Sequence, residues 1–363
     1  MAVLSHNKAM PKRTFVIKFI TRAAIYRLAI LAAILTILSI WSYYIMLKMP
    51  GKSYKGLLPP LTAEQIVLRD QLRRDVEALA SDIGERNIFQ PKKLAAAADF
   101  IEAALTQAGY KTTRQEYKMG HHVGYPTVVE NDTFANIEAQ ITGASHPDQI
   151  VVIGAHYDTV YGSPGANDNA SAVAANLALA RRFANQKMGR TLRFVFFTNE
   201  EAPFYHSEQM GSFVYAKSCK QKNENITAML SLETIGYYTS QPKSQSYPQL
   251  FGLFYPSTGN FLGFVSNTAS KKLLHQAIAS FRKHCKFPSE GGAIPEFIPG
   301  ISWSDHWSFW QHNYPAIMLT DTAPFRYPYY HSPDDTPDKI CFDELAIVVS
   351  GIETIINDLT SPK

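Results

Sequence analysis

The chain has 363 residues and a formal net charge of +4, but the charge is unevenly distributed along the sequence. Residues 1–55 carry nine Lys and Arg and no acidic residue, so the rest of the chain is net negative. Because a net negative domain repels phosphate, this distribution argues against a nucleic-acid partner. The length allows one large domain or two.

The first distinctive element is an apolar run at residues 28–47, which carries no formal charge. Twenty residues at roughly 1.5 Å each span a hydrocarbon core of about 30 Å. Most basic residues of the tail precede this run, and Trp41, Tyr43 and Tyr44 lie near its far end, as at a membrane interface. We expect a basic cytoplasmic segment at 1–27, a single-pass anchor at 28–47, and the remainder on the periplasmic, extracellular or lumenal side. A cleaved signal peptide or a buried core helix is the alternative.

A linker is expected at 48–61 and a folded domain at 62–363. Thr62 and Gln65 have the spacing of a capping box and begin a helix, and a second helix is expected at 91–108. The later elements are, in chain order, strands at 111–117, 135–141 and 150–153, a helix from 171, a strand at 191–198, a helix at 210–219, a strand at 228–232, strands and loops over 237–266, helices at 271–285 and 304–311, a strand at 315–320 and a helix at 342–359. Ser304 is the expected cap of the 304–311 helix.

This alternation of strands and helices predicts an α/β domain with a mixed, mostly parallel sheet between helices. Residue types that bind divalent cations gather where the predicted strands end. They are His156, Asp158, Asp168, Glu200, Glu201, Glu233 and His331. Taken singly, such residues are more often structural histidines, turn aspartates or solvated glutamates. Ligands of open α/β sheets bind outside the carboxyl ends of the strands, so the combination predicts a metal site there.

The segments GAHYDT, GANDNAS, FFTNEE, SLETIG and YHSPDDTPDKI resemble the co-catalytic dizinc aminopeptidases. That zinc exopeptidase family includes bacterial secreted aminopeptidases and glutamate carboxypeptidase. The resemblance covers roughly residues 60–360, with the motifs in the family's order. It implies a single α/β domain with two zinc ions per chain.

The resemblance also implies a ligand set. His156 and Glu233 would bind one zinc, Glu201 and His331 the other, and Asp168 would bridge the two ions. One departure is Glu233, because that position is often Asp in relatives. Zinc follows from the ligand types, which cobalt or manganese could share.

Three further roles follow from the same resemblance. Glu200 would be the general base, and Asp158 would orient the imidazole of His156. Some relatives place a carbonyl-oxygen-binding Tyr where this chain has Ile301. Tyr330 is the substitute we expect, although an aromatic of this loop could equally be structural.

The leading functional hypothesis is therefore a membrane-anchored zinc aminopeptidase acting on peptides, with lipid contacted through the N-terminal helix. A carboxypeptidase of the glutamate-carboxypeptidase type would need an Arg cluster, and only Arg326 is evident near the motifs. A non-catalytic receptor or scaffold relative would be expected to lose ligands, and none is missing here. Aromatic residues near the motifs further predict an apolar pocket for the first substrate residue, although core positions are the usual alternative for such side chains: Tyr237, Tyr238, Trp303, Trp307, Phe309 and Trp310.

Overall fold

The computed structural model describes residues 21–118, 133–248 and 251–361, so most of the basic N-terminal segment lies outside the described residues. The chain divides into two compact units, Met1–Ile45 and Met46–Lys363. In the first unit, helix α1 (Arg22–Ser42) begins at Thr21, whose hydroxyl accepts the backbone N–H of Ala24, and none of its residues is buried. A short π-helical turn, η1 (Tyr43–Leu47), follows.

Helix α1 and η1 together form the one helix of the described chain that is long and apolar enough to cross a membrane. A signal sequence near the N-terminus would pass the same test of length and composition. A core helix would have buried residues, and α1 has none. The core-helix alternative is therefore excluded, and the span and the signal sequence remain.

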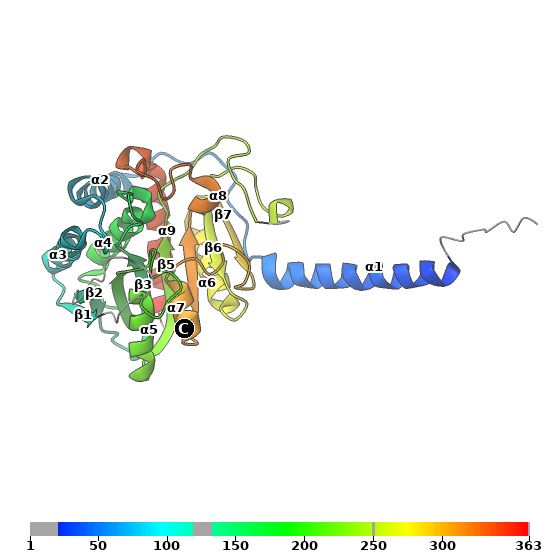
Figure 1. Cartoon of the computed structure of the whole chain (residues 1–363), viewed down its shortest axis with the longest axis horizontal. Helices are drawn as coiled ribbons and strands as arrows, with labels where there is room; N and C mark the ends of the chain where they lie inside the picture. The colour runs from blue at the N-terminus through cyan, green and yellow to red at the C-terminus, as the bar shows by residue number, and fades with distance from the viewer. Residues whose placement is uncertain (1–20, 119–132, 249–250, 362–363) are drawn as a thin grey trace, which may run out of the picture. The chain divides into compact units, whose positions relative to one another are not determined.

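The second unit is built on an eight-stranded mixed sheet with the order β1-β2-β4-β3-β5-β8-β6-β7 (Figure 1). Four of the seven pairings are parallel, so the predicted mixed, mostly parallel sheet is confirmed. The strands are β1 (Thr112–Lys118), β2 (Thr133–Ile141), β3 (His146–His156), β4 (Arg190–Phe197), β5 (Asn225–Glu233), β6 (Leu262–Ser266), β7 (Ser289–Ala293) and β8 (Ala316–Thr320).

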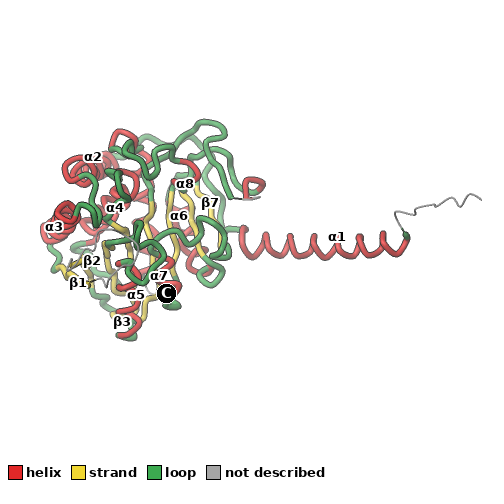
Figure 2. Tube along the Cα trace, viewed as in Figure 1, coloured by secondary structure: helices red, strands yellow, loops and turns green. Residues whose placement is uncertain are grey.

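Helices cover both faces of this sheet (Figure 2). One hydrophobic cluster joins the sheet to α2 (Ala63–Glu77), α3 (Pro91–Gln107), α4 (Ser171–Phe183), α6 (Lys271–His284) and α9 (Phe342–Thr360). A second cluster joins the opposite face to α5 (Gly211–Gln221) and α7 (His306–Gln311). The remaining short helices are η2 (Ala78–Ile83), η3 (Ala166–Ala170), η4 (Phe251–Leu253), α8 (Ala323–Arg326) and η5 (Pro337–Lys339).

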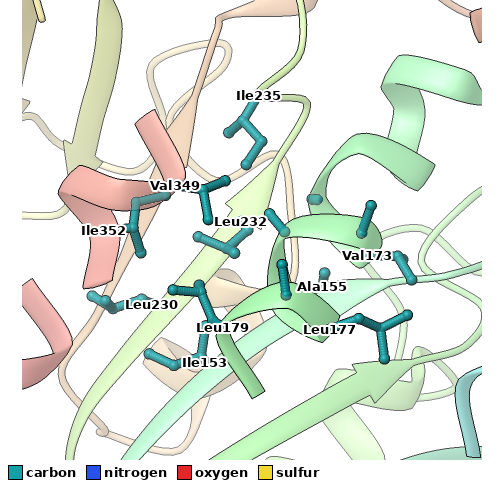
Figure 3. Packing of buried hydrophobic residues seen from close by; sticks show 14 of the residues in the cluster. Ile153, Ala155, Val173, Leu177, Leu179, Leu230, Leu232, Ile235, Val349 and Ile352 are labelled. Atoms are coloured by element: carbon teal, nitrogen blue, oxygen red, sulfur yellow. The ribbon is translucent and has the colours of Figure 1, made fainter. Parts of the chain in front are cut away.

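Successive side chains along a strand point to opposite faces of the sheet and so contribute to both clusters. On β3, Val151 and Ile153 belong to the first cluster, whereas Val152 belongs to the second. This two-residue period is what a strand buried on both faces requires. Figure 3 shows the first cluster, where Ile153 and Leu230 of adjacent strands lie near side chains of α4 and α9.

Most predicted elements are found within a few residues of their expected ends, and the capping box of Thr62 and Gln65 is formed. Two departures concern the C-terminal third. Strand β7 and helix α8 were not predicted. Ser304 does not cap α7: Asp305 precedes the helix without a side-chain cap, and the Ser304 hydroxyl donates to Glu233 instead.

Candidate metal centre

Two groups of metal-binding side chains lie at the carboxyl ends of the central strands. The first group is His156, Asp168 and Glu233, and the second is Asp168, Glu201 and His331. Within each group the donor atoms lie within 4.8 Å of one another. Because β3 pairs in parallel with both β4 and β5, the residues that end or follow these strands converge at one edge.

Asp168 belongs to both groups and presents a different oxygen to each. Its Oδ1 lies 3.3 Å from His156 Nε2, and its Oδ2 lies 3.2 Å from His331 Nε2. Glu233 Oε2 lies 3.3 Å from His156 Nε2, and Glu201 Oε2 lies 3.4 Å from His331 Nε2. A carboxylate with one oxygen toward each group is the arrangement that a ligand bridging two cations requires.

Several donor atoms of these groups are buried and make no hydrogen bond within the described residues. They include His156 Nε2, Asp168 Oδ1 and Glu201 Oε1. Leaving such an atom unsatisfied costs about 1–3 kcal/mol, and a bound cation removes that cost. Imidazole nitrogens and carboxylate oxygens are also ordinary zinc ligands. The residues present therefore fit a pair of zinc ions.

The pKa shifts of the clustered residues also indicate a site for cations. Burial disfavours the imidazolium of His331, but Asp168 and Glu201 outweigh it and raise the His331 pKa to about 11. Burial raises the pKa of Glu233 above its usual value, and the charge of Asp168 adds to this shift, in spite of the opposing charge of His156. Such a concentration of carboxylates needs positive charge beside it, which protons supply in the absence of metal.

Asp158 ties the ends of β3 and β4 together. Its two carboxylate oxygens accept the backbone N–H groups of Glu200 and Glu201, each at 3.1 Å. Its Oδ1 also lies 3.4 Å from His156 Nδ1, the ring nitrogen that faces away from Asp168. One side chain thus orients the imidazole and fixes the turn that carries both glutamates.

Glu200 belongs to neither group of donors. Its Oε2 lies 4.0 Å from His156 Nε2, and the side chain is buried. Burial disfavours its carboxylate, and this effect, together with the neighbouring carboxylates, raises the Glu200 pKa well above its usual value. The two adjacent glutamates therefore occupy different environments.

Asp335 supports the loop that carries Asp168, and the sequence analysis did not single it out. Its Oδ1 accepts the backbone N–H of Asn167 at 2.8 Å, and its Oδ2 accepts that of Asp168 at 3.1 Å. The Tyr327 hydroxyl also donates to Asp335 Oδ1, at 2.7 Å. The available signal was its position four residues after His331, in the SPDDTPD segment.

Arg86 is a second supporting residue that the sequence analysis missed. It is fully buried, and its guanidinium donates to the carbonyl oxygens of Tyr157, Pro164 and Gly165 at 2.7, 2.7 and 3.0 Å. Burial lowers the Arg86 pKa to about 10, while the acidic residues of the site oppose that shift. A single Arg after a helix carries no local sequence signal for this role.

The loop that carries Asp168 also requires a glycine at position 165. Its φ is +62°, and a Cβ at this position would lie 2.3 Å from the carbonyl oxygen of Asp168 and 2.4 Å from Thr159 Cγ2. Any side chain here would displace the backbone that positions the shared carboxylate.

An apolar pocket of ≈ 120 Å³ adjoins the metal centre, with Glu233 and Tyr330 in its wall. Its other walls include Phe251, Tyr255, Phe261, Phe264, Val265, Gly292, Ile294, Ile298, Trp303, Met318 and Phe325. Of the six aromatic residues predicted to form a pocket, only Trp303 lines it. Phe309 and Trp310 are core residues under α7, because the inner face of that helix packs on the sheet.

Two tyrosines lie near the acidic cluster. The ring of Tyr330 stacks on that of His331 with 3.8 Å between centroids. Tyr205, which the sequence analysis did not consider, follows Glu201 in the next loop, and burial together with the charges of nearby glutamates raises its pKa. Both phenol groups therefore remain protonated at neutral pH and able to donate a hydrogen bond.

Comparison with known proteins places the chain in a family. The pattern of Peptidase family M28 matches residues 136–354, which include every candidate ligand. The chain is also 34% identical over 296 residues to YfbL of Escherichia coli strain K12, covering 79% of this chain and 87% of YfbL. The chain therefore belongs to peptidase family M28, and its resemblance to the co-catalytic zinc aminopeptidases is confirmed.

Two further proteins illustrate the range of similarity. The aminopeptidase YwaD of Bacillus subtilis strain 168 is 27% identical over 226 residues, which cover 60% of this chain but only 43% of YwaD. The solved structure of BSAP, a zinc aminopeptidase from Bacillus subtilis, superposes with a TM-score of 0.65 at 14% identity, covering 81% of this chain and 95% of that one. Glutaminyl cyclases share the fold as well, so the fold alone does not select the reaction.

Proposed function

We propose that this protein is a membrane-anchored dizinc aminopeptidase that removes N-terminal residues from peptides. The observation that carries the proposal is the shared Asp168 between two groups of ligands, with Glu200 standing apart from both. Zinc aminopeptidases among the similar proteins support the same reaction class. The apolar helix at Arg22–Leu47 supports the anchor.

In this proposal His156, Asp168 and Glu233 hold one zinc, and Asp168, Glu201 and His331 hold the other. When bound, the ions supply Lewis-acid chemistry, polarising the scissile carbonyl and lowering the pKa of water at the site. Asp158 keeps the imidazole of His156 in position from the side opposite the donors.

The chain's own residues handle the proton. The Glu200 carboxylate accepts the proton of the attacking water and returns it to the leaving amine, so that the peptide bond breaks without a free hydroxide or amide anion. Backbone hydrogen bonds from Glu200 and Glu201 to Asp158 hold the base at a fixed distance from the ligands.

Tyr330 is the proposed hydrogen-bond donor to the substrate carbonyl oxygen. Its hydroxyl can donate because its pKa is raised by burial and by the surrounding carboxylates. Tyr330→Phe should lower kcat about 10²–10³-fold with zinc content unchanged. Tyr205→Phe is the matched comparison; if it alone produced the loss, the donor would be Tyr205.

Two features favour removal of an N-terminal residue over removal of a C-terminal one. The acidic cluster attracts a free ammonium group, and no Lys, Arg or His lines the described pocket to bind a carboxylate. Arg326, the cation that a carboxypeptidase would need, is buried and donates to Gln245 Oε1 at 2.8 Å and to the Phe261 carbonyl at 2.9 Å.

The pocket volume indicates the first residue. An engineered protein cavity of about 150 Å³ binds benzene, so ≈ 120 Å³ suits one Leu or Phe side chain. The test is elemental analysis of the purified full-length protein together with a panel of substrates. We expect two zinc ions per chain and cleavage of Leu- and Phe-amides but not of their N-acetyl forms. Cleavage of N-blocked peptides from the C-terminus would instead support the carboxypeptidase alternative.

A further inference from the structure

Two loops that form the pocket wall expose large apolar side chains at their tips. Residues 251–255 contribute two aromatic side chains to the pocket, yet Leu253 between them is 76% exposed. Residues 294–301 contribute apolar side chains in the same way, and Phe297 is 80% exposed. Exposed apolar residues that cluster around a binding site mark a surface that meets another apolar phase.

The segment that begins the catalytic unit is fixed to the sheet edge near these loops. Leu47 packs against the second hydrophobic cluster. Arg282 Nη1 donates to the carbonyl oxygen of Pro50 at 2.9 Å, and the backbone N–H of Ser289 donates to Ser53 Oγ at 3.0 Å. The first part of the segment at 48–61 is therefore bound to α6 and β7.

The same edge holds the first of the two loops. Met49 Sδ lies 3.3 Å from the position that a Cβ on Gly291 would occupy. The hydroxyl of Tyr255 donates to the carbonyl oxygen of Gly291 at 2.9 Å. Strand β7 is the last strand of the sheet, beside β6 (Figure 1). Leu253, two residues before Tyr255, is thus held within a few residues' reach of Met49.

A chain that leaves a bilayer near Leu47 and is fixed to the protein from Met49 onward has almost no slack. At no more than about 3.6 Å per residue, the two steps from Leu47 to Met49 span at most about 7 Å. The loops at the β7 edge are therefore tethered by a short length of chain to the point where the apolar helix ends.

We propose that Leu253 and Phe297 insert into the lipid surface beside the anchor, so that the pocket opens at the membrane interface. The inference rests on the proposed function, because it requires the apolar helix to be retained as an anchor. It adds a lipid-binding surface and a substrate class, namely peptides held at the membrane surface with an apolar N-terminal residue. Such a residue could enter the pocket without crossing bulk water.

The first test measures contact with lipid in the full-length protein reconstituted into lipid nanodiscs. Cys is introduced at Leu253 or Phe297 and labelled with an environment-sensitive fluorophore. Thr113→Cys is the matched control, because Thr113 is exposed on β1 at the opposite edge of the sheet. That edge lies seven strand spacings from β7, roughly 33 Å. Wild-type protein labelled in parallel measures the background from the three native cysteines.

Nitroxide-labelled lipids should quench the probes at 253 and 297 and leave the probe at 113 unquenched. Equal quenching at all three positions, or none at any, would refute the proposal. Nanodiscs of zwitterionic lipid and of mixed anionic lipid should give the same result, because the contact is apolar.

The second test separates docking from catalysis. The double variant Leu253→Ser, Phe297→Ser should cleave a soluble Leu-amide at the wild-type kcat/KM. On a peptide tethered to the same nanodisc by a C-terminal acyl chain, its kcat/KM should fall at least about tenfold, because the two apolar side chains no longer hold the pocket at the lipid surface. Equal loss on both substrates would overturn the docking role. Failure of the wild type on the soluble amide would instead reject the proposed peptidase function.

Discussion

The adjacent glutamates provide the sharpest test of the mechanism, because only one of them belongs to a group of metal-binding side chains. Glu201 Oε2 lies 3.4 Å from His331 Nε2 and belongs to a ligand group. Glu200 belongs to none and is the proposed base. Changing each to Gln keeps the volume of the side chain but removes its charge and its capacity to accept a proton.

For Glu200→Gln we expect both zinc ions to be retained, since all five donors remain. A positioned base typically contributes about 10²–10⁴-fold, so kcat should fall by that factor, which corresponds to about 2.7–5.4 kcal/mol in the barrier. The KM for a Leu-amide should change little. The backbone N–H that donates to Asp158 is untouched, so the turn should keep its geometry.

For Glu201→Gln we expect loss of metal together with loss of activity. The second group would have one carboxylate, shared with the first group, and one imidazole. The zinc content should fall from two ions per chain toward one. Metal content by elemental analysis and kcat on a Leu-amide, measured on both variants, decide the matter. Glu208→Gln is the matched control, because Glu208 is exposed and pairs only with Lys217 within the described contacts.

The assignment would be wrong if Glu200→Gln lost its metal or kept full activity. The same holds if Glu201→Gln kept two tightly bound ions. A change in the far-UV circular dichroism spectrum of either variant would indicate misfolding, and the conservative Glu→Asp replacement at the same position would then be measured instead. Glu200→Asp should keep both ions and recover part of kcat.

Three further predictions follow from the geometry. Gly292→Val should place its Cβ 2.7 Å from Ile294 Cδ1 and 2.8 Å from the Tyr255 hydroxyl, which narrows the pocket. The kcat/KM should then fall about 10–200-fold for Phe-amide and remain near wild type for Ala-amide. A parallel fall on both substrates would contradict the pocket assignment. Asp335→Asn should weaken zinc binding about 10–100-fold without removing a ligand, because one oxygen that accepts a backbone N–H becomes an NH₂ group; Asp334→Asn, at an exposed neighbour, should leave zinc affinity unchanged. Removal of residues 1–45 should give a soluble protein with wild-type kcat/KM on Leu-amide, since the second unit contains the whole site; an insoluble or inactive product would mean that the first unit supports the fold.

The general architecture could be predicted because its signals are local. The apolar runs that become β3 and β5 end in a polar residue, the run that becomes β4 is followed by polar residues, and the loop before α4 is marked by Gly, Pro and Asn. Parallel neighbours place such ends at a common edge, so candidate ligands from distant parts of the sequence could be assembled without coordinates. All five are brought together in the structure.

Strand β7 shows where local signals fail. Its sequence Ser-Glu-Gly-Gly-Ala has neither β-branched nor aromatic residues, so nothing in it predicts a strand. It is a strand because it pairs with β6 over all five of its residues. Gly291 and Gly292, which lower the strand propensity of this segment, are also the residues that leave room for the pocket and for Met49.

The sequence by itself therefore determined the fold class, the family resemblance and the identity of the candidate ligands, because short motifs and strand periodicity are written in neighbouring residues. Only the tertiary structure decided which aromatic residues line the pocket and which are core, since that depends on the face each one presents after packing. It also decided that Arg86 and Asp335 support the metal loop, because their partners are backbone groups contributed by other segments of the chain. Almost every residue type carries the same backbone N–H and C=O groups. A sequence therefore cannot show which of these groups will form a hydrogen bond with a distant side chain.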